Sequence, residues 1–122
     1  DAHGERLELL PEARPTIEKL ASQGIHLSIA SRNDRQPAEQ ALTLFDLLRF
    51  FSFPQIHWGG KDLSIQTILT LFSERADIRL QPSEVLFIDD WESNVQAAAA
   101  LGIRTLQMGK AIHRLQEIFR HL

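Results

Sequence analysis

With 122 residues, the chain has the length of one ordinary domain and can bury a substantial core. A hydrophobic fraction of 43% and a charged fraction of 24% are typical of globular proteins, and a net charge of -3 gives no electrostatic reason to expect nucleic acid or an anionic membrane as partner. Cysteine is absent, which excludes disulfides and thiolate metal sites, and no apolar run approaches the roughly 18 residues of a membrane span, so we expect one soluble, cytoplasmic domain over residues 1–122.

Helices are predicted where apolar residues recur every three or four positions, and strands where short apolar runs are bounded by polar turns. Pro15 suits the first turn of the first helix, and Gly24 is typical of a helix end. In chain order the pattern predicts a helix over 11–23, a strand over 25–30, a helix over 37–48, a short strand over 55–57, a helix over 62–74, a strand over 85–88, a helix over 92–101, a strand over 103–108 and a helix over 110–122.

This alternation of helices and strands implies crossover connections between parallel strands. The predicted fold is therefore an α/β, Rossmann-like three-layer sandwich in which helices cover both faces of a parallel sheet. The helical spacing further predicts which side chains face the core. Among these are Phe45 in the second helix, Leu63 and Ile65 in the third, and Ile112 and Ile118 in the last.

The most informative stretch is an apolar strand that ends on two acids. Residues 85–88 are all apolar, which is typical of a strand buried on both faces of a parallel sheet. Asp89 and Asp90 follow at its carboxyl end, where ligands bind in open α/β sheets. One aspartate could cap the following helix. Two adjacent acids exceed what a cap requires, so we interpret at least one as a ligand for a cation or substrate group.

Two other polar turns follow predicted strands, namely residues 31–34 (Ser-Arg-Asn-Asp) and residues 59–61 (Gly-Gly-Lys). If the strands are parallel, both turns reach the same edge as the acidic pair. A hydroxyl with nearby backbone amides, an ammonium group and two carboxylates are the parts of a phosphoryl-transfer site. Taken singly, Ser31 could be a turn residue and Lys61 a solvated charge.

Three larger side chains lie in or beside these turns. Arg32 is a possible second phosphate contact because its planar guanidinium suits oxyanions, although a surface salt bridge is an equal alternative. Trp58 and Trp91 could contact a substrate or pack at the rim of the core. The sequence leaves these alternatives open.

Residues 29–34, 57–61 and 87–90, together with Asn94, resemble motifs two, three and four of the haloacid dehalogenase (HAD) superfamily. The Ser-Arg turn and the Gly-Gly-Lys turn are similar to its magnesium-dependent phosphatase branch (HAD-IIIC-like). That branch includes enzymes that load a glyceryl unit onto an acyl carrier protein, and the turn at 31–34 is similar to theirs as well. The resemblance extends over about residues 7–109.

The resemblance implies a role for each matching residue. Ser31 would donate a hydrogen bond to a substrate phosphate, and Lys61 would neutralise charge on the phosphate and on the attacking carboxylate. Asp90 would bind Mg²⁺, with Asp89 as a direct or indirect partner of the metal. Asn94 stands where many relatives have a further acid, so it would orient the site through hydrogen bonds.

One family motif is missing from the 122 residues. The first motif is a hydrophobic strand ending in Asp-x-Asp, which supplies the nucleophile and the general acid/base. Residues 1–4 resemble the segment that follows this motif, so the chain is interpreted as incomplete at its amino terminus. By itself the chain is expected to be inactive or nearly so.

The leading hypothesis is a Mg²⁺-dependent HAD phosphatase that, when complete, hydrolyses a phosphomonoester of a small molecule or a protein through an aspartyl-phosphate. One alternative is a glyceryl-loading domain acting on an acyl carrier protein. Another is a non-catalytic module that binds phosphate or a partner without turnover. The motifs do not identify the substrate or the oligomeric state.

Overall fold

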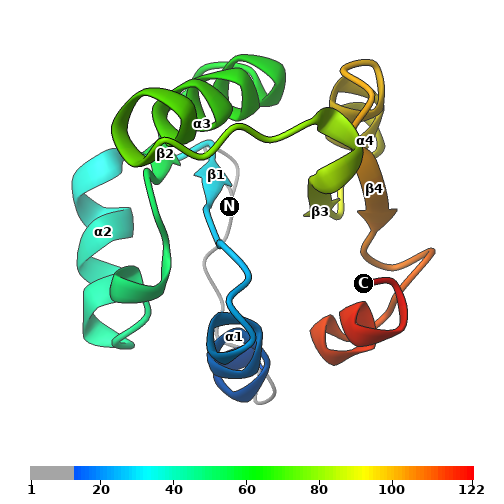
Figure 1. Cartoon of the computed structure of the whole chain (residues 1–122). Coiled ribbons are helices and arrows are strands. Elements are labelled where there is room, and N and C mark those ends of the chain that lie inside the picture. Colours follow the sequence, from blue (N-terminus) through cyan, green and yellow to red (C-terminus); the bar gives the residue numbers. More distant parts are fainter. Residues whose placement is uncertain (1–12) are drawn as a thin grey trace. The chain divides into compact units, whose positions relative to one another are not determined.

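The computed structural model describes residues 13–122 of the chain. The chain divides into two compact units, Asp1–Gly60 and Lys61–Leu122, and each is described by itself. Both combine helices with short parallel strands, as Figure 1 shows. The α/β class with parallel strand pairing is therefore confirmed, while the single-domain expectation stays a prediction. No helix among residues 13–122 is long and apolar enough to cross a membrane.

The first unit is built on one parallel strand pair. Strand β1 pairs with β2, in a register that sets Ala30 opposite Gln55 and Ser31 opposite Ile56. The elements of this unit are α1 (Ala13–Ser22), β1 (Ala30–Ser31), α2 (Arg35–Leu44), a 3₁₀ helix at Leu48–Phe50, and β2 (Gln55–Ile56).

Helix α1 forms because its apolar stripe repeats at helical spacing. Ala13, Ile17 and Leu20 are buried on one face. The helix ends with Gly24 in the left-handed region at φ 78°, as a glycine-terminated helix requires. The predicted helix and its glycine stop are confirmed over the described residues; positions 11 and 12 lie outside them.

Two predictions for this unit are wrong in extent. The strand predicted over 25–30 is assigned only at β1, so Ser31 ends the strand instead of opening the following turn. The helix predicted over 37–48 begins at Arg35 and stops at Leu44, which leaves Phe45 exposed. Asp46 adopts φ 56° and the Leu47 amide bonds back to the Leu42 carbonyl at 2.8 Å, which is the Schellman way of ending a helix.

The second unit contains a parallel β–α–β arrangement. Strand β3 pairs with β4 over four residues, from Leu86 opposite Arg104 to Asp89 opposite Gln107. Ile65, Ala98 and Ile103 are buried together at the centre of a hydrophobic cluster. The elements of this unit are α3 (Lys61–Ala76), a 3₁₀ helix at Pro82–Glu84, β3 (Leu86–Asp89), α4 (Glu92–Ala99), β4 (Arg104–Gln107) and a 3₁₀ helix at Leu115–Arg120.

The carboxyl-terminal segment differs from its prediction. No α-helix covers 110–122; the Gly109 amide instead donates to the Ile112 carbonyl at 2.7 Å, and a 3₁₀ helix forms at Leu115–Arg120. The turn at Gly109 places Ile112 opposite Met108 in a parallel β-bridge. Ile112 is completely buried there. The predicted burial of Ile112 and Ile118 is therefore confirmed although the predicted helix is wrong.

Strand β3 is less buried than its apolar sequence predicts, since all of its residues are partly exposed. It belongs to a sheet of two strands among the described residues. The carbonyls of Val85 and Asp89 bond to the β4 side, so the alternate residues Leu86 and Ile88 direct their backbone groups to the opposite edge. That edge has no partner strand in the part of the chain that the structure describes.

Helix α3 offers a matched pair of residues for testing the packing of the second unit. Ile65 is 5% exposed in the cluster, whereas Leu63, predicted to face the core, is 56% exposed. Replacement of Ile65 by Ala is expected to lower the free energy of unfolding by about 2–5 kcal/mol, because it leaves a cavity. Replacement of Leu63 by Ala should change it by less than about 0.5 kcal/mol. Urea unfolding followed by circular dichroism measures both, and equal losses would contradict the assigned helix face.

Candidate active site

A buried ion pair joins the start of α3 to the end of β3. Lys61 Nζ lies 3.4 Å from Asp89 Oδ2, and the two side chains are 2% and 7% exposed. Lys61 comes to this position because it is the first residue of α3, directly after the Gly59-Gly60 turn. Asp89 is the last residue of β3. A charged pair at this depth interacts strongly because little water screens it.

Two further donors hold the Asp89 carboxylate. The backbone amide of Trp91 donates to Oδ1 at 2.8 Å, and Asn94 Nδ2 donates to Oδ2 at 3.3 Å. Both arise from the local chain path, since Trp91 caps the amino end of α4 and Asn94 lies in its first turn. The carboxylate of Asp89 is therefore held by the Lys61 ammonium and by two hydrogen-bond donors.

Asp90 has a different environment from its neighbour. Asp90 is exposed, and its backbone carbonyl accepts from Gln107 Nε2 of β4 at 3.3 Å. The Asp89 carbonyl accepts from the Met108 amide at 2.9 Å, so β4 also fixes the backbone of the acidic turn. Asp90 thus lies at the exposed side of the turn, while the Asp89 carboxylate is paired with Lys61.

Ser31 ends β1 in the first unit and is 4% exposed. Its Oγ makes no hydrogen bond to any described residue. A buried hydroxyl without a partner is unfavourable, so such a group calls for a ligand or another explanation. Arg32, the next residue, is exposed.

The structure brings together three of the predicted site residues, Lys61, Asp89 and Asn94, with Asp90 beside them in the second unit. Ser31 and Arg32 belong to the first unit. The convergence of the serine turn with the lysine and acidic turns at one edge therefore stays a prediction.

Among residues 13–122, no three His, Cys, Asp or Glu side chains form a group that could hold a metal. Asp90 is the exposed carboxylate beside the buried pair, and it has the oxygen donors that Mg²⁺ prefers. Because Mg²⁺ usually keeps several waters and binds substrate phosphate, one or two carboxylates are compatible with such a site.

The sequence did not indicate the contacts of Gln107 and the Trp91 amide. A backbone amide carries no residue-type signal, and Gln107 reaches the acidic turn only through the strand register. The sequence also did not indicate that Asp34 accepts a hydrogen bond from Trp58 Nε1, at 2.9 Å.

The parallel strand pairing and the acidic turn at the end of β3 are typical of α/β proteins, which bind ligands at the carboxyl ends of their strands. The family model described as haloacid dehalogenase-like hydrolase matches residues 1–108. The chain therefore belongs to the haloacid dehalogenase-like hydrolase family.

Individual relatives agree with this membership. The human protein named magnesium-dependent phosphatase 1 is 28% identical over 109 residues, which are 88% of this chain and 58% of that protein. Mouse acyl-CoA dehydrogenase family member 10 is 25% identical over 108 residues, which are 88% of this chain but 10% of that protein.

A solved structure shows a similar fold. It is that of a Thermotoga maritima protein assigned as a beta-phosphoglucomutase, with a TM-score of 0.66 and 26% identity. The match covers 92% of this chain and 58% of that one. The chain therefore spans less than two thirds of the length of these relatives.

The buried pair can be tested by removing one charge at a time. Replacement of Lys61 by Met leaves Asp89 buried without its cation and is expected to lower the free energy of unfolding by about 3–5 kcal/mol. Adding Asp89→Asn to Lys61→Met should recover part of that loss, because the uncompensated charge is removed. A double-mutant cycle by urea unfolding measures the coupling. A loss below about 1 kcal/mol for the Lys61 variant would mean that the pair is not buried.

Proposed function

We propose that the chain is the larger part of a magnesium-dependent phosphatase of the haloacid dehalogenase family. The observation that carries this proposal is the buried Lys61–Asp89 pair beside the exposed Asp90, at the carboxyl end of a parallel strand. This is the edge at which ligands bind in α/β sheets. Family membership and the relative named magnesium-dependent phosphatase 1 support the reaction class.

The environments of the two aspartates suggest separate roles. Asp89 holds Lys61 at a fixed position, and Asn94 and the Trp91 amide hold Asp89 in turn. In this proposal Lys61 stabilises negative charge on the phosphoryl group, an effect that is largest when the cation is already positioned and shielded from water. Asn94 acts as an orienting residue.

Asp90 is the proposed Mg²⁺ ligand, with Asp89 next to the metal as a partner. The bound Mg²⁺ would supply charge neutralisation at the phosphoryl oxygens. Ser31 is the proposed hydrogen-bond donor to the phosphate, which its buried and unpartnered hydroxyl supports. Arg32, exposed after it, is proposed as a further phosphate contact.

The nucleophile is proposed to lie on a strand outside the 122 residues. An aspartate oxygen on that strand would bond to phosphorus as the bond from phosphorus to the leaving oxygen breaks, and water would then hydrolyse the aspartyl-phosphate. One edge of β3 has no partner strand among residues 13–122, and this supports the proposal because Leu86 and Ile88 direct backbone groups to that edge. An extended segment can add to such an edge through main-chain hydrogen bonds.

The first test concerns the nucleophile. The 122-residue chain is expected to show no Mg²⁺-dependent hydrolysis of p-nitrophenyl phosphate. Activity should appear when an apolar strand ending in Asp-x-Asp is joined to its amino terminus, because the strand supplies the attacking carboxylate. The matched control carries Asn in place of the first aspartate of that strand. Equal activity with and without the strand would contradict the proposed mechanism.

The second test concerns the metal, in the protein that carries the strand. Asp90→Asn is expected to abolish the stimulation of hydrolysis by Mg²⁺, because the amide lacks the carboxylate charge. Glu92→Gln, an exposed acid two residues away, is the matched control and should retain it. Initial rates measured against Mg²⁺ concentration compare the two. Undiminished stimulation in the Asp90 variant would remove that residue from the metal site.

A further inference from the structure

The peptide group that joins Asp90 to Trp91 is hydrogen-bonded at both of its ends. Its N–H, on Trp91, donates to Asp89 Oδ1 at 2.8 Å. Its carbonyl, on Asp90, accepts from Gln107 Nε2 at 3.3 Å. A trans peptide group is planar, and its N–H and C=O point in opposite directions. The two hydrogen bonds therefore restrain rotation of this peptide plane from opposite sides.

The same peptide group supports the Asp89 carboxylate. If the plane rotated, the Trp91 amide would turn away from Asp89 Oδ1. The other oxygen of this carboxylate lies 3.4 Å from Lys61 Nζ in the buried pair. Hydrogen bonds at the two ends of one peptide group also polarise and strengthen one another. The bond from Gln107 therefore contributes to the orientation of the Asp89 carboxylate.

The peptide group on the other side of the Asp90 α-carbon is also held. The Asp89 carbonyl accepts from the Met108 amide at 2.9 Å. Both peptide planes that flank Asp90 are thus bonded to two consecutive residues, Gln107 and Met108. Because the backbone rotates only about the two bonds between such planes, holding both planes determines the direction in which the Asp90 side chain leaves the backbone.

Gln107 is itself held at its backbone. The register of the strand pair places it opposite Asp89, at the last position of β4. Its carbonyl accepts from the amides of Lys110, at 3.1 Å, and Ala111, at 2.9 Å, in the turn that follows the strand. The side-chain amide of Gln107 therefore extends to the acidic turn from a backbone with little freedom of its own.

A neutral donor is the chemistry that this position requires. A carbonyl oxygen only accepts hydrogen bonds, so an apolar side chain would leave it without this partner. An acid in place of Gln107 would repel the carbonyl and add negative charge beside Asp89 and Asp90. A cation would place positive charge next to the two aspartates. The amide of glutamine donates a hydrogen bond and adds no charge.

We propose that Gln107 is a positioning residue for the acidic turn. Its side-chain amide holds the peptide group after Asp90 and thereby orients the carboxylates of Asp89 and Asp90. The consequence for Mg²⁺ rests on the proposed function, in which Asp90 is the metal ligand. Replacement of a residue that orients a metal ligand typically lowers metal affinity about 10–100-fold.

The first measurement is amide hydrogen exchange by NMR in the variants Gln107→Met and Gln116→Met. Met has about the length of Gln but no donor, and Gln116, exposed in the carboxyl-terminal 3₁₀ helix, is the matched control. In Gln107→Met the Trp91 amide is expected to exchange about three to ten times faster, because its peptide group has lost one of two hydrogen bonds. The Arg104 amide, which donates to the Val85 carbonyl at the other end of the strand pair, should be unchanged in both variants.

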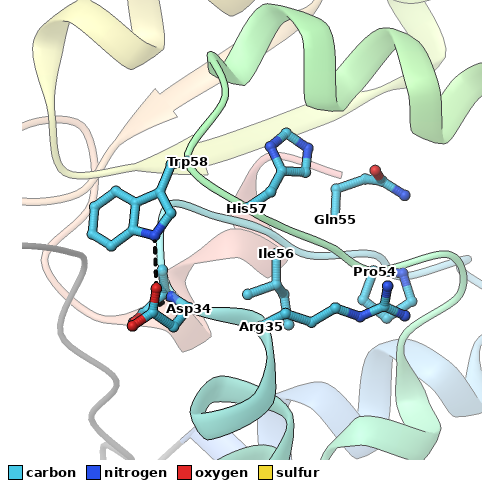
Figure 2. A pocket seen from close by; sticks show the side chains of 8 residues that line it. Asp34, Arg35, Pro54, Gln55, Ile56, His57 and Trp58 are labelled. Atoms are coloured by element: carbon cyan, nitrogen blue, oxygen red, sulfur yellow. Dashed lines mark hydrogen bonds between the residues drawn. The ribbon is translucent and has the colours of Figure 1, made fainter.

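The second measurement is Mg²⁺ binding, reported by the emission of Trp91, which is 64% exposed beside Asp90. Trp58, the other tryptophan, belongs to the first unit, where its Nε1 donates to Asp34 (Figure 2). Trp58→Phe therefore leaves Trp91 as the single tryptophan and keeps the contacts of the acidic turn. In this background Gln107→Met is expected to raise the Mg²⁺ dissociation constant about tenfold or more. The control variant should leave it unchanged.

The outcomes separate this inference from the proposed function. Equal exchange of the Trp91 amide in the two variants, or an acceleration that extends to the Arg104 amide, overturns the positioning role. Equal Mg²⁺ affinity in the two variants also overturns it. If the Trp91 amide alone exchanges faster in Gln107→Met and Mg²⁺ changes the emission of no variant, the positioning role stands and the metal site of the proposed function is wrong.

Discussion

The second unit depends on the burial of two opposite charges, Lys61 and Asp89. Removing a charged group from water is costly, and the attraction between the pair offsets that cost only where the remaining hydrogen-bonding capacity is also met. Here the Trp91 amide and the Asn94 side chain donate hydrogen bonds to the Asp89 carboxylate oxygens. The pair contributes little net stability by itself, but it defines one position for the first residue of α3 relative to the end of β3. In the proposed function, a cation held in this way would meet an incoming anion with little reorganisation.

The same ion pair places the adjacent residues Asp89 and Asp90 in different environments. Successive residues at a strand end point in opposite directions, so Asp89 turns into the protein toward Lys61 while Asp90 is exposed. The acid in the interior holds the lysine ammonium at 3.4 Å. The acid at the surface is the one assigned to the cation in the proposed function. A strand that ended in a single aspartate could not both pair with the buried lysine and expose a carboxylate, so the two positions of the acidic pair differ in environment.

Much of the fold could be predicted because hydrophobic periodicity determines which elements form. The α/β class, helix α1 and strand β4 followed from that pattern. The errors lie where local turn hydrogen bonds override it. Asp46 ends α2 in a left-handed conformation without a glycine to signal it, and the loop back at Gly109 buries Ile112 without an α-helix. Leu63 fits the helical stripe by spacing but faces solvent.

The candidate site was predictable to a similar degree. The motif spacing identified Lys61, Asp89 and Asn94 as site residues, and the structure brings them into contact. The pairing of Lys61 with Asp89 was not predicted, since the resemblance assigned the lysine to the phosphate and the nucleophile. The hydrogen bond between Trp58 and Asp34 was also not predicted, because the sequence shows Asp34 only as the last residue of a polar turn.

Three features of the described residues are unfavourable for stability in isolation: the unpartnered hydroxyl of Ser31, the missing cap bond of Asp34, and the open edge of β3. A missing cap alone costs about 1 kcal/mol, and a buried hydroxyl without a partner costs about 1–3 kcal/mol. Sequences under selection for stability alone would remove such defects, since stabilising substitutions are easy to find. The proposed function would supply partners for two of these groups, a phosphate oxygen for Ser31 and a nucleophile-bearing strand for β3.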